Sequence, residues 1–178
     1  MLRLFVGIEF PPELKLRLSL LNVGLPGAKW VDAGNLHVTL RFIGEVDEGT
    51  AGDIDDALLQ IRAPRFALAL AGIGHFGNGA AARMIWIGVE KNPALLHLHE
   101  KVENALMRLR LVPEGRRYVP HVTLARLRQV PPARLQEFLT EHALFRAEPF
   151  PVDRFSLVAS YLTKAGPIYE EQADYRLA

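Results

Sequence analysis

Two spacings of apolar residues alternate along the chain and predict a mixture of strands and helices. Runs rich in β-branched and aromatic residues are typical of strands, and they occupy residues 2–10, 36–44, 66–74, 84–89, 119–127, 150–161 and 168–177. Leucine and isoleucine recur at helical spacing over residues 12–22, 47–61, 93–109 and 131–142. A turn over residues 163–167 is expected to join the last two strands as a hairpin.

The order of these elements predicts the fold class. Strands and helices alternate irregularly, with hairpins among them, which favours an α+β fold with antiparallel sheets over a doubly wound parallel sheet. A strand, a helix and a strand carrying the letters HVTL follow one another twice. This repetition predicts two similar lobes. A chain of 178 residues fits one domain, so we expect residues 1–178 to form a single bilobal domain with interleaved lobes.

Composition and charge narrow the function classes. The formal net charge is +1, from 21 basic and 20 acidic residues, unlike a protein that coats nucleic acid by neutralising phosphates. The chain contains no cysteine, which excludes disulfides and thiol catalysis. The longest apolar run, residues 66–74, is about half as long as a helix that spans a membrane. With no secretory leader in view, we expect a soluble, cytoplasmic monomer that has no protein partner.

The letters HVTL occur at residues 37–40 and again at 121–124. Side chains alternate between the two faces of a strand, so each motif places His and Thr on one face and Val and Leu on the other. If the two lobes pack with pseudo-twofold symmetry, the two His-Thr pairs face each other across a cleft. The cleft then holds two imidazoles and two hydroxyl groups.

Two imidazoles suit a reaction that needs both a base and an acid near neutral pH. Phosphodiester cleavage at a ribose is such a reaction, because the attacking and leaving oxygens lie on opposite sides of phosphorus. The two threonine hydroxyls can donate hydrogen bonds to the non-bridging oxygens, where charge develops. An isolated histidine in a β-strand is more often structural than catalytic. The repetition of the motif on two predicted strands nevertheless favours catalysis.

The stretches NLHVTLRFIGEV and PHVTLARL resemble the paired motifs of the two-histidine (2H) phosphoesterases. More narrowly, they resemble the RNA 2′,3′-cyclic phosphodiesterases, also called the 2′-5′ RNA ligase family. The opening RLFVGIEFPPELK, the approach KWVDAGNLH and the segment MIWIGVE extend the similarity over most of the chain. The resemblance implies a bilobal α+β fold around a central cleft. It also implies metal-independent hydrolysis of a terminal 2′,3′-cyclic phosphate on RNA to a 2′-phosphomonoester. A reversible 2′-5′ RNA ligation, in which a 5′-hydroxyl replaces water, is implied as well.

The resemblance also assigns roles to residues. It implies that His37 is the proton donor and His121 the proton acceptor, an assignment that the sequence alone leaves open. Thr39, Thr123 and Arg126 correspond to phosphate-binding residues of the family. Strict alternation places Arg126 on the face opposite His121, so its role requires a strand end or a β-bulge that turns the side chain back.

Other candidates follow from their closeness to the motifs. Alternation puts Arg41 on the same face as His37, so Arg41 is a candidate contact to the substrate strand; a solvated, ion-paired arginine is the alternative. The same alternation predicts that Phe42 is buried. Trp30 and Tyr118 remain as candidate surfaces on which a nucleobase stacks.

Three competing functions stay open. The first is an enzyme that acts on small cyclic or 2′-5′-linked nucleotides in place of RNA. The second is an RNA-binding module whose histidines bind phosphate without catalysis. A zinc site is the third, but two His and two Thr without a carboxylate are a poor ligand set. We therefore expect no metal and no cofactor.

Overall fold

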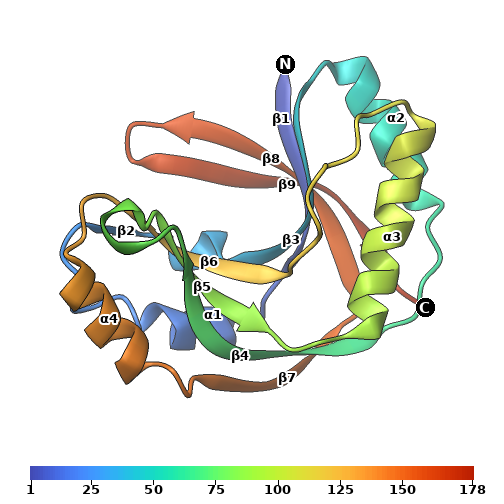
Figure 1. The fold of residues 1–178 in the computed structure, drawn as a ribbon. Helices are drawn as coiled ribbons and strands as arrows, with labels where there is room; N and C mark the ends of the chain where they lie inside the picture. The colour runs from blue at the N-terminus through green and yellow to red at the C-terminus, as the bar shows by residue number, and fades with distance from the viewer.

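The computed structural model describes residues 1–178 and contains nine strands and four α-helices (Figure 1). The strands are β1 Leu2–Glu9, β2 Ala28–Trp30, β3 His37–Val46, β4 Phe66–Phe76, β5 Met84–Val89, β6 His121–Leu127, β7 Arg146–Val152, β8 Arg154–Thr163 and β9 Gly166–Arg176. The helices are α1 Pro12–Ser19, α2 Glu48–Leu59, α3 Pro93–Arg108 and α4 Pro132–Glu141. No helix is both long enough and apolar enough to cross a membrane.

The strands form two antiparallel sheets, which confirms the predicted α+β class. One sheet has four strands in the order β3-β1-β8-β9, and the other has five in the order β2-β6-β5-β4-β7. Each sheet contains one motif strand, β3 or β6. Each motif strand pairs antiparallel with the strand that precedes it in the predicted repeat, β1 or β5. The repetition seen in the sequence therefore corresponds to two similarly built lobes.

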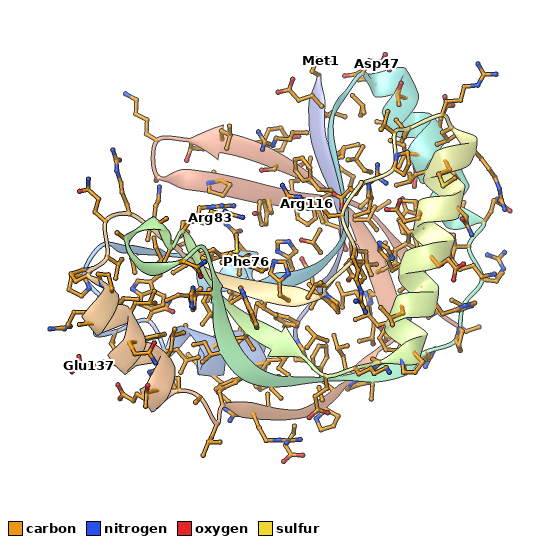
Figure 2. All side chains as sticks on the ribbon, in the orientation of Figure 1. Met1, Asp47, Phe76, Arg83, Arg116 and Glu137 are labelled. Atoms are coloured by element: carbon orange, nitrogen blue, oxygen red, sulfur yellow. The ribbon has the colours of Figure 1, made fainter.

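The helices begin at recognisable signals in the sequence. Proline opens three of them, because its missing N–H costs nothing in the first turn. The Asp47 side chain accepts from the Thr50 amide at 2.7 Å and caps α2. Asn92 caps α3 by accepting from two backbone amides. Glu137 projects from α4 away from the sheets (Figure 2).

Two helices lie beside each sheet, α2 and α3 beside the four-stranded sheet and α1 and α4 beside the five-stranded sheet (Figure 1). Helices α2 and α3 contact each other, and α3 contacts β3 while α2 contacts β9 of the four-stranded sheet. Helix α1 follows β1 of that sheet, yet its Arg17 binds the Arg146 carbonyl of β7 in the five-stranded sheet. The Trp30 ring of β2 meets Phe138 of α4, with ring centroids 5.7 Å apart.

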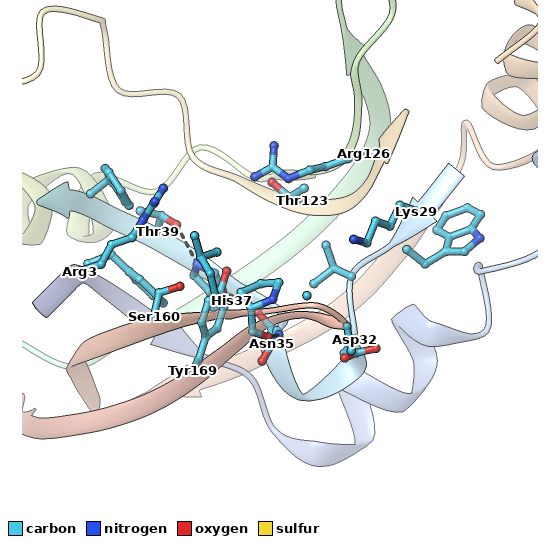
Figure 3. A pocket seen from close by; sticks show the side chains of 18 of the residues that line it. Arg3, Lys29, Asp32, Asn35, His37, Thr39, Thr123, Arg126, Ser160 and Tyr169 are labelled. Carbon is cyan, nitrogen blue, oxygen red and sulfur yellow. Dashed lines mark hydrogen bonds between the residues drawn. The ribbon is translucent and has the colours of Figure 1, made fainter. Parts of the chain in front are cut away.

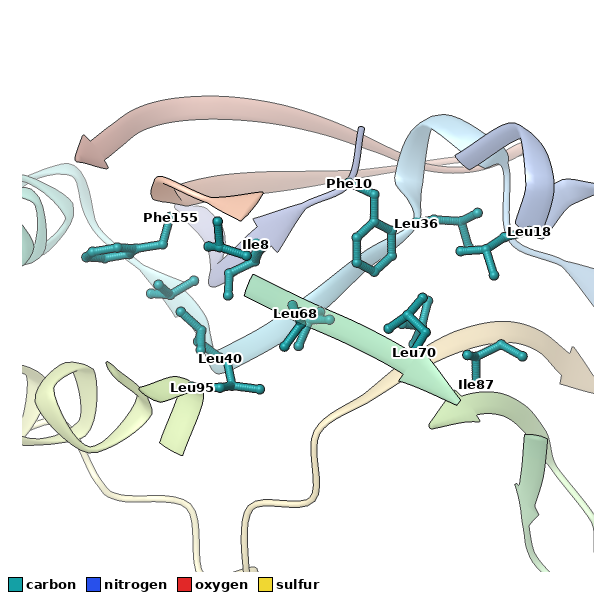
Figure 4. Packing of buried hydrophobic residues seen from close by; sticks show 14 of the residues in the cluster. Ile8, Phe10, Leu18, Leu36, Leu40, Leu68, Leu70, Ile87, Leu95 and Phe155 are labelled. Carbon is teal, nitrogen blue, oxygen red and sulfur yellow. The ribbon is translucent and has the colours of Figure 1, made fainter. Parts of the chain in front are cut away.

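One hydrophobic cluster joins the two sheets (Figure 4). The four-stranded sheet contributes Ile8, Leu40 and Phe155, all almost completely buried. The five-stranded sheet contributes Leu68 and Ile87, which have no exposed surface. Packing of this cluster fixes the position of β3 relative to β6, and therefore the position of one motif relative to the other.

One predicted strand is wrong. Residues 150–161 were expected to form a single strand, but Asp153 separates β7 from β8. Strand β7 pairs with β4 in the five-stranded sheet, whereas β8 pairs with β1 and β9 in the four-stranded sheet. The chain thus crosses between lobes at this point. Apolar residues continue on both sides of Asp153 because both strands face the shared core.

Candidate active site

The two motifs meet in one cleft of about 600 Å³ (Figure 3). His37 and Thr39 of β3 line it together with His121 and Thr123 of β6. In both motifs the His and Thr side chains are half-buried and the intervening Val is fully buried. The face assignment predicted for the four motif residues is therefore confirmed.

Aromatic rings and hydrogen bonds hold His37 on both sides. The Phe5 ring stacks on the imidazole with centroids 4.6 Å apart, and the Tyr169 ring meets it edge-on at 5.4 Å. Its Nδ1 lies 2.7 Å from the Asn35 carbonyl oxygen, and its Nε2 lies 2.8 Å from the Thr39 hydroxyl. This enclosure desolvates the ring.

Burial is the largest cause that lowers the pKa of His37 below its ordinary value. The hydrogen bond to the Asn35 carbonyl acts in the opposite direction and raises the pKa. The positive charges of His121 and Lys15 lower it further. His121 affects the pKa of His37 because the two imidazoles line the same cleft.

His121 occupies a more open position. Its Nδ1 lies 2.8 Å from the Val119 carbonyl oxygen, and the Phe76 ring meets the imidazole edge-on at 5.3 Å. Because a carbonyl oxygen only accepts, Nδ1 of both motif histidines carries a proton. The Nε2 atom is therefore the one that gains or loses a proton in each ring, which is the arrangement that acid–base catalysis requires.

The two hydroxyl groups differ in their partners. Thr39 is bonded to the His37 ring, whereas the Thr123 hydroxyl donates only to the Met84 sulfur at 3.5 Å. A thioether is a weak acceptor. The Thr123 hydroxyl is therefore available to a stronger acceptor such as a phosphate oxygen.

A β-bulge occurs at the same place in both motif strands. Opposite β1, Val6 pairs with Arg41 and Gly7 with Thr39, which leaves Leu40 without a partner. Opposite β5, the register skips Leu124 in the same way. An extra residue reverses the alternation beyond it, so the side chains that follow each motif change faces.

The bulge brings Arg126 to the cleft face, where it lies above Thr123 and lines the cleft (Figure 3). The equivalent position in the first motif is Phe42, which also lines the cleft and is 42% exposed. The expectation that Phe42 is buried is therefore wrong. The strict alternation from which it was predicted ends at Leu40.

The expected position of Arg41 is wrong for the same reason. Arg41 is only 4% exposed and does not line the cleft. Its guanidinium donates to Glu103 of α3 at 2.6 Å, to the Phe42 carbonyl at 3.0 Å and to the Val112 carbonyl. Arg41 therefore ties α3 and the segment after it to β3, and it has no donor directed at the cleft.

The two aromatic candidates have different surroundings. Tyr118 does not line the cleft; its hydroxyl donates to the Thr39 carbonyl at 2.9 Å, and its ring stacks on His99 at 3.8 Å. This bond links the segment that enters the second motif to the first motif. Trp30 lines the cleft, although its ring also packs against Phe138.

The charged residues that line the cleft are mostly basic. They are Arg3, Lys29, Arg126 and one acid, Asp32. None of the four forms an ion pair with a side chain of this protein. A cleft with three uncompensated cations favours an anionic ligand. The protein contains no cluster of three or more His, Cys, Asp or Glu side chains placed to hold a metal ion.

A family model described as the 2′-5′ RNA ligase superfamily matches residues 11–163 of the chain. The chain belongs to this superfamily. An RNA 2′,3′-cyclic phosphodiesterase of Thermotoga maritima is 35% identical over 176 residues, which cover 95% of this chain and 92% of that protein. The protein of the same name from Aeropyrum pernix is 36% identical over 168 residues, which cover 92% and 94%.

Solved structures agree with this membership in the 2′-5′ RNA ligase superfamily. A protein of Thermus thermophilus is 27% identical and superposes with a TM-score of 0.82 over 98% of this chain and 97% of its own. E. coli LigT, crystallised with 3′-AMP, is 26% identical and also has a TM-score of 0.82, over 99% and 98%.

The sequence interpretation missed several residues around the cleft of this superfamily member. Phe42 was placed in the core, and Lys29, Asn35 and Tyr169 were not predicted to line the cleft. Lys29 and Asn35 lie within the stretch KWVDAGNLH, which resembles the RNA 2′,3′-cyclic phosphodiesterases. That similarity was the signal by which the two residues could have been found. Tyr169 comes from the β8–β9 hairpin, far from either motif in sequence, and no local pattern marks it as a cleft residue.

Proposed function

We propose that this protein is an RNA 2′,3′-cyclic phosphodiesterase that opens a terminal cyclic phosphate to a 2′-phosphomonoester without a metal ion. The observation that carries the proposal is the presence, in one cleft, of two imidazoles whose Nδ1 atoms are both bound to carbonyl oxygens. Two hydroxyl groups and three cations surround them. The names of the relatives, which are RNA 2′,3′-cyclic phosphodiesterases, support the same activity.

In this mechanism His121 is the base and His37 the acid. Neutral Nε2 of His121 removes a proton from a water molecule, which attacks phosphorus and forms a new P–O bond. The bond from phosphorus to the 3′ oxygen breaks, and protonated Nε2 of His37 gives its proton to that oxygen. The more open position of His121 suits a group that must meet water.

The remaining cleft residues stabilise the developing charge. The Thr39 and Thr123 hydroxyls donate to the non-bridging phosphate oxygens, and Arg126 adds a planar, charged donor. The negative charge of the bound phosphate also favours protonated His37, and thus offsets the lowering of its pKa by burial. Substrate binding therefore prepares the acid for its task.

Phe42 offers a face on which the nucleobase stacks. Its ring is exposed in the cleft, and the Arg3 guanidinium lies 5.3 Å from its centroid. Stacking on an aromatic ring accepts every base, as expected of an enzyme that acts on RNA ends of varied sequence. Trp30 is a second lining aromatic, while Arg41 and Tyr118 act by positioning β3 and the second motif.

The same groups serve ligation if a 5′-hydroxyl takes the place of water. Arg3 and Lys29 lie on opposite sides of His37 in the cleft (Figure 3), so cations are present on both sides of the reacting phosphate. We propose reversible 2′-5′ ligation at this site: the 5′-hydroxyl oxygen forms the new bond to phosphorus, the bond to the 3′ oxygen breaks, and the 3′ oxygen takes the proton of His37. We also propose that the protein works in the cytoplasm, a reducing compartment that suits a chain without cysteine. We propose that it works there as a monomer.

The experiment that tests the function uses an RNA oligonucleotide ending in a 2′,3′-cyclic phosphate, incubated with the protein in the presence of EDTA. The expected product is a terminal 2′-phosphate. A 3′-phosphate would mean that the roles of the two histidines, or the orientation of the ribose, are reversed. Loss of activity in EDTA would contradict the metal-independent mechanism, and no hydrolysis under any condition would reject the function.

A further inference from the structure

We propose that Lys29, together with its neighbour Arg126, which lies between it and the reacting phosphate, forms a second phosphate site. This site binds the phosphodiester on the 5′ side of the terminal nucleotide, and Arg126 contacts both phosphates. This inference rests on the proposed function and specifies its substrate class. The cyclic phosphate alone is present in any nucleoside 2′,3′-cyclic phosphate, whereas a 5′-phosphate on the same ribose is characteristic of an RNA end. We call these two residues the Lys29–Arg126 pair.

The sheet register places the two cations side by side. Strand β2 pairs antiparallel with β6, and Lys29 is the direct partner of Arg126. Side chains of direct partners lie on the same face of a sheet, with Cβ atoms about 4.5–5.5 Å apart. This face is the cleft face, because both residues line the cleft.

Like charges placed directly opposite each other are unfavourable, and here nothing in the protein compensates them. Neither Lys29 nor Arg126 forms an ion pair. Asp32, the one carboxylate that lines the cleft, is not within ion-pair distance of either. An anion bound between the two cations would remove the repulsion.

A second pair of like charges in the same protein provides a contrast. Arg154 and Arg176 are also direct partners, on β8 and β9. There, Arg154 is bound to Asp153 at 3.1 Å and to Asp174 at 3.2 Å. The protein thus neutralises an opposed pair of cations on its surface with its own carboxylates, but leaves the Lys29–Arg126 pair in the cleft without them.

The position of the pair suits a phosphate next to the reacting one. Arg126 follows Thr123 by three residues, which is at most about 10 Å along a strand, and its long side chain spans part of that distance. Lys29 lies on the neighbouring strand, about 4.8 Å further across the sheet. In Figure 3 the Lys29 ammonium points into the cleft, on the side of His37 opposite Arg3.

The test compares adenosine 2′,3′-cyclic phosphate with the same compound carrying a 5′-phosphate. For the wild-type protein, the 5′-phosphate should raise kcat/KM about tenfold, as expected for a charge-assisted contact. In Lys29→Gln this gain, the ratio of kcat/KM with and without the 5′-phosphate, should fall to about twofold or less. Lys29 is exposed, so the substitution leaves folding intact, which its thermal unfolding midpoint verifies.

Lys164→Gln is the matched control, because Lys164 is also exposed but does not line the cleft; it should keep the full gain. Equal kcat/KM for both compounds in the wild type would overturn the second phosphate site and leave the proposed function standing. An equal loss on both compounds in Lys29→Gln would instead place Lys29 at the reacting phosphate. Hydrolysis of neither compound would reject the proposed function and this inference together.

Discussion

His37 and His121 carry the same chemical group in very different surroundings. His37 is held between Phe5 and Tyr169 and bonded at both ring nitrogens, whereas the His121 ring forms one hydrogen bond, through Nδ1. The asymmetry matters because acid and base must be in different protonation states at the same pH. A pair of identical environments would not separate the two roles.

The closeness of the two imidazoles is testable through their titration. Burial lowers the pKa of His37, and the charge of His121 lowers it further. We expect NMR titration of the His37 ring to give a pKa below about 6.5, and we expect His121→Gln to raise that pKa because a neighbouring positive charge is removed. A His37 pKa that does not respond to His121→Gln would contradict the shared cleft.

The same shift affects stability. Since the folded state has the lower pKa, the unfolded chain binds the His37 proton more readily. The contribution of this group is therefore complete above about pH 6.5 and decreases as the pH falls from there to the folded-state pKa. The free energy of unfolding of His37→Gln should depend less on pH across this window than that of the wild type.

Phe42 should matter for substrates that carry a base and not for those that lack one. Phe42→Ala removes the proposed stacking face, worth roughly 1–3 kcal/mol, so we expect kcat/KM for adenosine 2′,3′-cyclic phosphate to fall about tenfold. Phe42→Tyr retains an aromatic ring and should keep most of the activity. The control substrate is an abasic ribose 2′,3′-cyclic phosphate; if its hydrolysis falls as much, Phe42 does not bind the base.

At the scale of elements, Arg41 joins α3 to β3 beneath the first motif. Arg41→Ala removes three hydrogen bonds and leaves the half-buried carboxylate of Glu103 without its arginine partner. We expect the free energy of unfolding to fall by about 3–5 kcal/mol, measured by urea denaturation. Arg154→Ala, which removes an exposed ion-paired arginine, is the control and should change stability little. Equal effects of the two substitutions would contradict a buried, structural Arg41.

The motif strands show what local sequence does and does not predict. The alternation of His-Val-Thr-Leu predicts the correct faces for four residues in each strand. The bulge that follows is visible in the second motif, where Leu124 and Ala125 are two successive apolar residues. In the first motif the second buried residue is Arg41, whose partner Glu103 lies 62 residues away. A charge buried by a distant partner leaves no local signal, so Phe42 was assigned to the wrong face.

For the whole molecule, the fold class follows from the order of elements, but the connections between the lobes do not. The crossing at Asp153, from β7 in one sheet to β8 in the other, depends on strand pairing over long distances. So does the place of Tyr169 beside His37, because β9 and β3 are strands of the four-stranded sheet that are separated by β1 and β8 and lie far apart in the sequence. These features are set by tertiary packing between distant segments, which the pattern of neighbouring residues does not predict.

We propose that residues 1–178 unfold as one cooperative unit, because a single hydrophobic cluster contains residues of both sheets. Both tryptophans, Trp30 and Trp86, lie in the five-stranded sheet, so their fluorescence reports on that lobe. Far-UV circular dichroism reports on both lobes. The two signals should change at the same urea concentration, whereas two separated transitions would show that the lobes unfold independently.

The most direct measurement of the central claim is the turnover of an RNA ending in a 2′,3′-cyclic phosphate by His37→Ala, His121→Ala and the double variant. Each single variant should lose on the order of 10³-fold in kcat. Groups that act in one step are not additive, so the double variant should be little slower than either single one. Wild-type turnover by either single variant, with the fold intact, would show that the two imidazoles do not act together on one phosphorus.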